Sequence, residues 1–167
     1  MNRLIQITFI MVGFFIFLYA YSNETKFPRK MMKENKLTVI INKPISDVFE
    51  FTTDPQKTPV WIDSVEKEQT NEWPPRSGTT YMNRGKSGPW SVYKVSKFED
   101  CKEFELVKQD ESTYHVNYTY NTLPDGSTQL IYHEWVTTGE LEDPFSQVTL
   151  DKLKEVLEEE NRLTLSL

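Results

Sequence analysis

The residues best suited to chemistry lie in two segments of alternating sequence, 114–122 and 128–138, which the turn-forming residues 123–126 separate. If those four residues form the loop of a hairpin, residues whose numbers sum to 249 stand opposite one another. One face of the hairpin then holds an imidazole among aromatic rings. Its members are Tyr118, Tyr120, His133 and Trp135.

Acid–base chemistry at this hairpin has two candidate residues, His133 and Glu134, which would give or take a proton from a bound molecule. Because neighbouring strand residues point to opposite faces, a hairpin of this register turns only His133 toward the aromatic face. A register changed by one residue turns Tyr132 and Glu134 there instead. The sequence leaves both registers open.

Aromatic rings elsewhere in the chain extend this face into a predicted ligand site. An apolar pocket with a few convergent polar groups is the usual construction of a small-molecule site. The same rings can equally form an ordinary hydrophobic core, so both interpretations stay open. The predicted lining residues are Trp61, Tyr81, Trp90, Tyr118, Tyr120, His133 and Trp135.

Signatures of several other functions are absent from the sequence. It has no glycine-rich phosphate loop, no paired-histidine metal motif and no nucleophile elbow. Two histidines and the single cysteine, Cys101, supply few ligands for a metal, so we predict no metal and no cofactor. A net charge of -6 argues against nucleic acid as a partner. The sequence shows no coiled-coil pattern, and the oligomeric state stays open.

An antiparallel sheet must position these residues. Past Trp61 the sequence alternates in short segments, and glycine, proline, asparagine or aspartate separates most of them. No helix-length segment intervenes, which predicts a meander. The predicted strands are 64–71, 79–85, 90–99, 103–108, 114–122 and 128–138.

A long helix is predicted after the sheet, from Asp143-Pro144 to about Leu163. Aspartate is a common helix cap, and proline is favoured in the first turn. Apolar residues recur along one side of this helix, so one broad face should be buried. The residues of that face are Phe145, Leu150, Leu153, Val156, Leu157 and Leu163.

The segment before the meander predicts one strand followed by two short helices. Leu37–Asn42 is apolar and β-branched, and Pro44 suits the first residue of a helix. That helix must end before Pro55, because proline disfavours the helical conformation of the residue before it. Asp54 and Pro55 then predict the start of a second helix, with Trp61 just beyond its end.

This strand, the aspartate–proline step and the tryptophan after it resemble the opening of the SRPBCC superfamily, which includes polyketide cyclases, START lipid-transfer domains and the birch pollen allergen. The resemblance covers residues 37–163. It implies an α+β helix-grip fold, in which a curved antiparallel sheet wraps around a long C-terminal helix and encloses an apolar cavity. It also implies binding or transport of a small hydrophobic molecule or lipid. The alternatives are a polyketide cyclase or dehydratase and an interaction module like the helix-grip cochaperones of Hsp90.

Residues 1–30 form a separate hydrophobic segment, apolar from residue 4 to residue 21. It predicts a membrane anchor, although a secretory signal peptide shares its charged start and apolar middle, and translation from Met31 or Met32 would leave it out. Positive charges are concentrated after the segment, which would keep the domain on the cytoplasmic side of a membrane. A start at either methionine would give a soluble cytoplasmic domain, and export is the third possibility.

Overall fold

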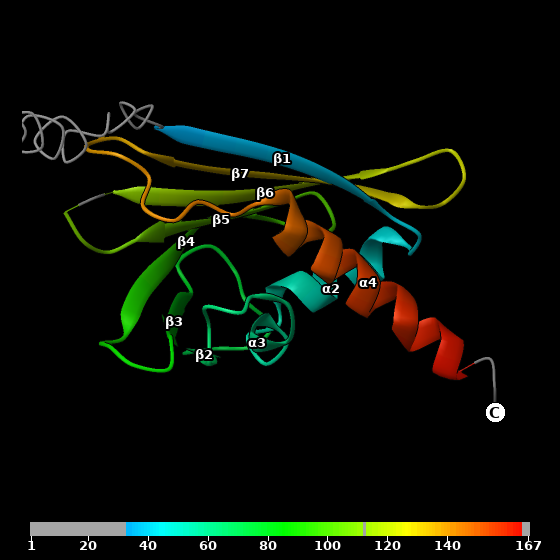
Figure 1. Cartoon of the computed structure of the whole chain (residues 1–167), viewed down its shortest axis with the longest axis horizontal. Helices are drawn as coiled ribbons and strands as arrows, with labels where there is room; N and C mark the ends of the chain where they lie inside the picture. The colour runs from blue at the N-terminus through cyan, green and yellow to red at the C-terminus, as the bar shows by residue number, and fades with distance from the viewer. Residues whose placement is uncertain (1–32, 112, 165–167) are drawn as a thin grey trace, which may run out of the picture. The chain divides into compact units, whose positions relative to one another are not determined.

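One antiparallel sheet dominates the computed structural model, which describes residues 33–111 and 113–164 (Figure 1). Within this part of the chain the strand order is β1-β7-β6-β5-β4-β3-β2, and each strand pairs antiparallel with its neighbours. The strands are β1 (Glu34–Ile41), β2 (Lys67–Thr70), β3 (Thr80–Arg84), β4 (Ser91–Glu99), β5 (Glu103–Lys108), β6 (Tyr114–Thr122) and β7 (Thr128–Val136).

The described residues form three helices on the inner face of the curved sheet, α2 (Ile45–Thr53), α3 (Thr58–Trp61) and α4 (Gln147–Thr164) (Figure 1). The register of β4 against β5 shifts between Val95 and Lys97, and such a bulge increases the local bend and twist of a strand. The predicted α+β helix-grip architecture is confirmed, with two short helices after the first strand and a long helix at the end.

The two short helices follow proline-containing signals, but the second begins later than predicted. Pro44 is the residue before α2, whose last residue, Thr53, comes two positions before Pro55. Asp54 and Pro55 form a turn and do not start α3. The Asp54 carboxylate accepts a hydrogen bond from the backbone N–H of Gln56 at 2.8 Å, and its carbonyl accepts one from Lys57 at 3.0 Å. These bonds close a turn before Thr58.

Helix α4 also begins later than the predicted Asp143-Pro144 start. Asp143 has a φ of 49°, which is left-handed and cannot belong to an α-helix. Two residues on, the backbone N–H of Phe145 donates to the Glu134 carboxylate of β7 at 2.7 Å. The chain is therefore held against the sheet before it turns into the helix. Of the predicted apolar face, Leu150, Leu153 and Leu157 are buried and Val156 is half-buried, whereas Phe145 lies before the helix begins.

The β6–β7 hairpin has a different register from the predicted one. Paired residues sum to 250, as in Tyr118 opposite Tyr132, because the loop contains five residues, 123–127. Asp125 accepts hydrogen bonds from both the N–H and the hydroxyl of Ser127, at 3.0 and 2.6 Å, which keeps Ser127 in the loop. The predicted sum of 249 is wrong, and the inner face of β7 carries Tyr132 and Glu134.

The predicted N-terminal membrane segment, residues 4–21, and the alternative starts at Met31 and Met32 lie outside the described residues. Among residues 33–111 and 113–164, no helix combines the length and the apolar character needed to cross a membrane. The anchor, the signal peptide and the later start all stay predictions.

Candidate ligand-binding site

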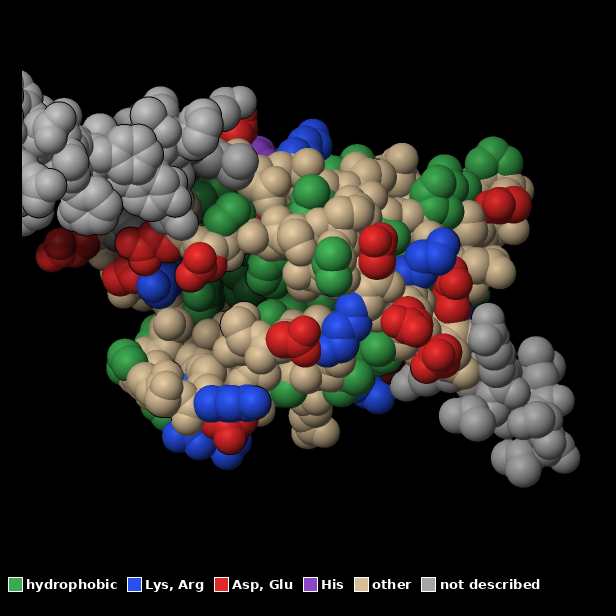
Figure 2. Space-filling view, in the orientation of Figure 1, with side chains coloured by type: hydrophobic (Ala, Val, Ile, Leu, Met, Phe, Trp, Pro, Cys, Tyr) green, Lys and Arg blue, Asp and Glu red, His purple; other side chains and the backbone are tan. Residues whose placement is uncertain are grey.

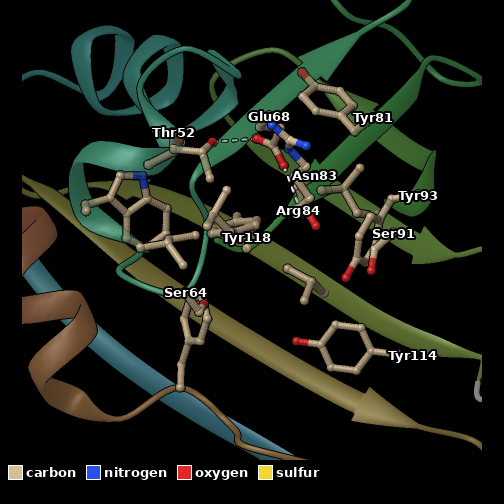
Figure 3. A pocket seen from close by; sticks show the side chains of 18 of the residues that line it. Thr52, Ser64, Glu68, Tyr81, Asn83, Arg84, Ser91, Tyr93, Tyr114 and Tyr118 are labelled. Carbon is tan, nitrogen blue, oxygen red and sulfur yellow. Dashed lines mark hydrogen bonds between the residues drawn. The ribbon is translucent and has the colours of Figure 1, made fainter. Parts of the chain in front are cut away.

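A cavity of about 280 Å³ lies between the inner face of the sheet and the segments around α3 and the start of α4. Strands β2 to β7 all contribute to its wall (Figure 3). Aromatic rings make up much of the surface, and hydroxyl, amide and carboxylate groups interrupt it. The rings include Trp61, Tyr81, Tyr93, Tyr114, Tyr118 and Tyr132.

Three polar residues form a row across one end of the cavity. Asn83 of β3 stands opposite Glu68 of β2 on one side and Ser91 of β4 on the other. The Glu68 carboxylate accepts a hydrogen bond from the Asn83 amide at 3.1 Å and another from the Thr58 hydroxyl at 2.5 Å, one on each oxygen (Figure 3). Thr58 lines the cavity together with the three residues of the row, so this end is polar.

The charge of Glu68 is not neutralised by a cation within the described part of the chain. No lysine or arginine of the described residues forms an ion pair with Glu68. Burial raises the pKa of Glu68, and the two hydrogen bonds only partly offset that effect. Burial also raises the pKa of Tyr93 to about 12, with a further contribution from the negative charge of Glu68. The electrostatic influence of Glu68 therefore reaches β4.

Glu134 does not line the cavity but bonds to three residues that do, Tyr114, Tyr132 and Phe145, and it is 2% exposed. Its Oε1 accepts hydrogen bonds from the Asn35 amide at 2.8 Å and the Phe145 N–H at 2.7 Å. Its Oε2 accepts from the hydroxyls of Tyr114 at 2.5 Å and Tyr132 at 3.0 Å. A carboxylate has about four acceptor sites, so Glu134 is fully occupied. It joins β1, β6 and β7 to the segment that enters α4.

A second hollow adjoins the cavity, and Tyr93 and Tyr114 line both. This outer groove is lined by three acidic residues, Asp110, Glu140 and Glu142. Among the described residues that line it, the one lysine, Lys108, forms an ion pair with Asp110 at 2.6 Å. Figure 2 shows acidic side chains beside a hollow whose floor is apolar. The described lining of this groove therefore carries an excess of negative charge.

Three of the predicted lining residues, Trp61, Tyr81 and Tyr118, do line the cavity. Trp61 packs edge-on against Phe145, with ring centroids 6.0 Å apart. The Tyr81 hydroxyl donates to the Thr53 carbonyl at 2.7 Å, which ties β3 to the end of α2. Whether these residues contact a ligand stays a prediction.

The other four predicted lining residues lie elsewhere. Tyr120 belongs to the core, where its hydroxyl pairs with Thr52 at 2.7 Å. Trp90 is 37% exposed, and the Arg84 guanidinium lies over its ring. Because the hairpin register differs from the predicted one, His133 and Trp135 lie on the outer face, where their rings pack 4.7 Å apart.

Sequence reasoning missed Glu68 and Asn83. Strand β2 has the sequence Lys67-Glu68-Gln69-Thr70, which contains no apolar residue to mark its inner face. The alternation that identifies a buried face was therefore absent. One weak signal was available. Tyr81 and Asn83 fall on the same face of β3, so pairing this strand with β2 would have placed Glu68 on that face.

Comparison with known proteins gives structural relatives only. No family model and no curated protein sequence matches the chain. Protein SA2116 of unknown function from Staphylococcus aureus has a TM-score of 0.61 at 11% identity, over 77% of this chain and 95% of that one. The Aha1 dimer from Colwellia psychrerythraea has 0.57 at 15%, over 76% and 97%. Protein MLL2253 from Mesorhizobium loti has 0.58 at 17%, over 76% and 98%. At these identities the likeness shows the fold.

The described residues contain no group of three histidine, cysteine, aspartate or glutamate side chains that could hold a metal ion. The two predicted acid–base candidates differ in position. His133 lies on the outer face, 3.3 Å from the Glu34 carboxylate, whereas Glu134 lies on the inner face, outside the cavity lining, with both oxygens already bonded.

Proposed function

We propose that this domain binds a small amphipathic molecule in the cavity between the sheet and the helices, as an SRPBCC-like ligand-binding domain. The cavity itself carries the proposal, because aromatic rings line it and hydrogen-bonding groups are confined to particular parts of its wall. Sites of this construction hold the body of a ligand by apolar contact and fix its orientation by a few polar groups.

The volume limits the size of the ligand. A cavity of about 280 Å³ lies just below the usual range of ligand pockets, roughly 300–1,000 Å³. It suits a molecule of one or two rings or a short branched chain. A full-length lipid would have to extend into the groove that begins at Tyr93 and Tyr114. We therefore favour a small metabolite over a lipid as the cargo.

The proposal is tested by filling the cavity. Val116 is buried on its wall, and Val116→Phe adds a ring there. The matched control is Val92→Phe, which makes the same change on the exposed side of β4. Fluorescence titration with a neutral naphthalene probe should show saturable one-to-one binding to the wild type and to Val92→Phe, and a loss of about tenfold or more in Val116→Phe. Equal affinity in all three folded proteins would refute the cavity as the site.

We also propose that residues 4–21 attach this domain to a membrane. The support is the apolar sequence of that segment and the positive charges that follow it. Full-length protein should sediment with phosphatidylcholine vesicles and resist extraction by high salt, whereas a chain that begins at Met32 should stay in the supernatant. Equal partitioning of the two chains would remove the tether from this account.

A further inference from the structure

We infer that the ligand of this cavity is an amine, with a small apolar body and a primary ammonium group bound by Glu68. This inference rests on the proposed ligand-binding function and specifies its chemistry. It is carried by the position of Glu68 in the cavity wall, by the acceptor capacity that the fold leaves unused there, and by the acidic approach to the cavity.

Glu68 has hydrogen-bonding capacity that the described residues do not use. A carboxylate has about four acceptor sites, and the Thr58 hydroxyl and the Asn83 amide take one on each oxygen. A charge withdrawn from water without a counter-ion is costly, and the described chain supplies no cation to it. An ammonium group brings three donors and the opposite charge, so it would satisfy both deficits.

Arg84, at the end of β3, is not the counter-ion of Glu68. On β3, Tyr81 is buried and Asn83 is half-buried, whereas Arg84 is exposed. Its guanidinium lies over the ring of Trp90, 5.1 Å from the centroid. Arg84 also lines the cavity (Figure 3), but within the described part of the chain it forms no ion pair with Glu68.

The approach to the cavity favours the same charge. Glu140 and Glu142 are exposed in the outer groove, and Asp110 neutralises the lysine that lies there. A groove with an excess of one charge concentrates ligands of the opposite charge. A carboxylate or phosphate would meet repulsion at the groove and again at Glu68, whereas a cation would be attracted at both positions.

Neutral donors are weaker candidates for this position. A hydroxyl offers Glu68 one hydrogen bond and no charge, whereas hydrogen bonds between charged partners are about twice as strong as neutral ones. The test therefore compares ligands that share one ring system and differ only in the polar group: 1-naphthylmethylamine, 1-naphthylmethanol and 1-naphthoic acid.

The experiment is calorimetric titration of full-length protein with these three compounds at pH 8 and low salt. The amine should bind about tenfold or more tightly than the alcohol, and the acid most weakly. Glu68→Gln should reduce the preference for the amine over the alcohol to within about threefold. Glu66→Gln removes the same charge from an exposed position outside the cavity wall, and it should retain the preference.

The outcomes separate the two proposals. If the wild type binds the alcohol as tightly as the amine, the amine inference is overturned and the ligand-binding function still stands. The same holds if folded Glu68→Gln keeps the full preference. If none of the three compounds binds to the wild type, the proposed function fails, and the amine inference fails with it.

Discussion

Two carboxylates, Glu68 in the cavity wall and Glu134 just behind it, bonded to the cavity residues Tyr114, Tyr132 and Phe145, differ in how the fold uses them. Glu134 is fully buried and accepts four hydrogen bonds from β1, β6, β7 and the segment before α4. Glu68 is half-buried and accepts two, both from residues of the cavity wall. The first carboxylate connects elements that are far apart in the sequence. The second keeps capacity for a molecule from outside.

This contrast shows why a buried carboxylate near a cavity is not by itself a functional residue. What matters is whether its acceptor sites are occupied. Removing a carboxylate that satisfies several buried donors should destabilise the fold, whereas removing one that stands partly unsatisfied should leave the fold intact and change binding.

The largest effect is expected at Glu134. Glu134→Ala removes the shared acceptor of four hydrogen bonds, which come from buried Tyr132 and from half-buried Asn35, Tyr114 and Phe145, and the free energy of unfolding should fall by about 3 kcal/mol or more. Urea denaturation measures the change, with the exposed Glu142→Ala as a control that should stay within about 0.5 kcal/mol of the wild type. If Glu134→Ala stays within 1 kcal/mol, Glu134 does not have the structural role assigned to it.

A smaller loss is expected when one donor to Glu134 is removed. Tyr114→Phe deletes the hydroxyl that donates to Glu134, which should lower the free energy of unfolding by about 1.5–3 kcal/mol. Tyr118→Phe is the matched control, because Tyr118 lies in the same cavity and its hydroxyl has no hydrogen bond to any described residue. Equal losses in the two variants would contradict the importance of the bond to Glu134.

The opposite sign is expected at Glu68, and it depends on pH. The pKa of Glu68 is raised by burial, so the folded state binds the proton more tightly than the unfolded state, whose pKa is about 4.3. The wild type should therefore lose stability as pH rises from about 4.3 through the raised pKa. Glu68→Gln lacks this loss, and its stability relative to the wild type should increase over that range. Urea denaturation of both proteins at a series of pH values measures this. If the stability of Glu68→Gln minus that of the wild type stays flat or falls as pH rises, the prediction is wrong.

The smallest effect is expected on the outer face. His133→Phe should change the free energy of unfolding by less than about 0.5 kcal/mol and leave ligand affinity unchanged, because His133 does not border the cavity. The titration with 1-naphthylmethylamine measures the affinity. A drop of threefold or more would mean that the outer face takes part in binding.

Much of the architecture could be predicted from the sequence, because the signals are local. The apolar periodicity of 150–157 predicts which side of α4 is buried, and turn-forming residues mark most strand ends. The start of α4 could not be predicted this way. Asp143-Pro144 has the composition of a helix start, but a tertiary hydrogen bond from Phe145 to Glu134 holds that segment in another conformation.

The site was harder to predict, because it depends on register and on a polar strand. One additional loop residue, Ser127, exchanges His133 and Trp135 for Tyr132 and Glu134 on the inner face. Glu68 lies in a strand whose four residues are all polar, so its inward direction follows only from pairing with β3. Both facts are tertiary, and neither leaves a periodic pattern in the sequence.

The most direct test of the account is a nuclear magnetic resonance titration of ¹⁵N-labelled full-length protein with 1-naphthylmethylamine. Trp61 lines the cavity and Trp135 lies on the outer face, so their indole N–H signals report on the two sides of the sheet. The account predicts saturable shifts of the Trp61 indole and the Asn83 side-chain amide, with the Trp135 indole unchanged. Shifts at Trp135 with Trp61 and Asn83 unchanged, or no shift at any of them, would contradict it.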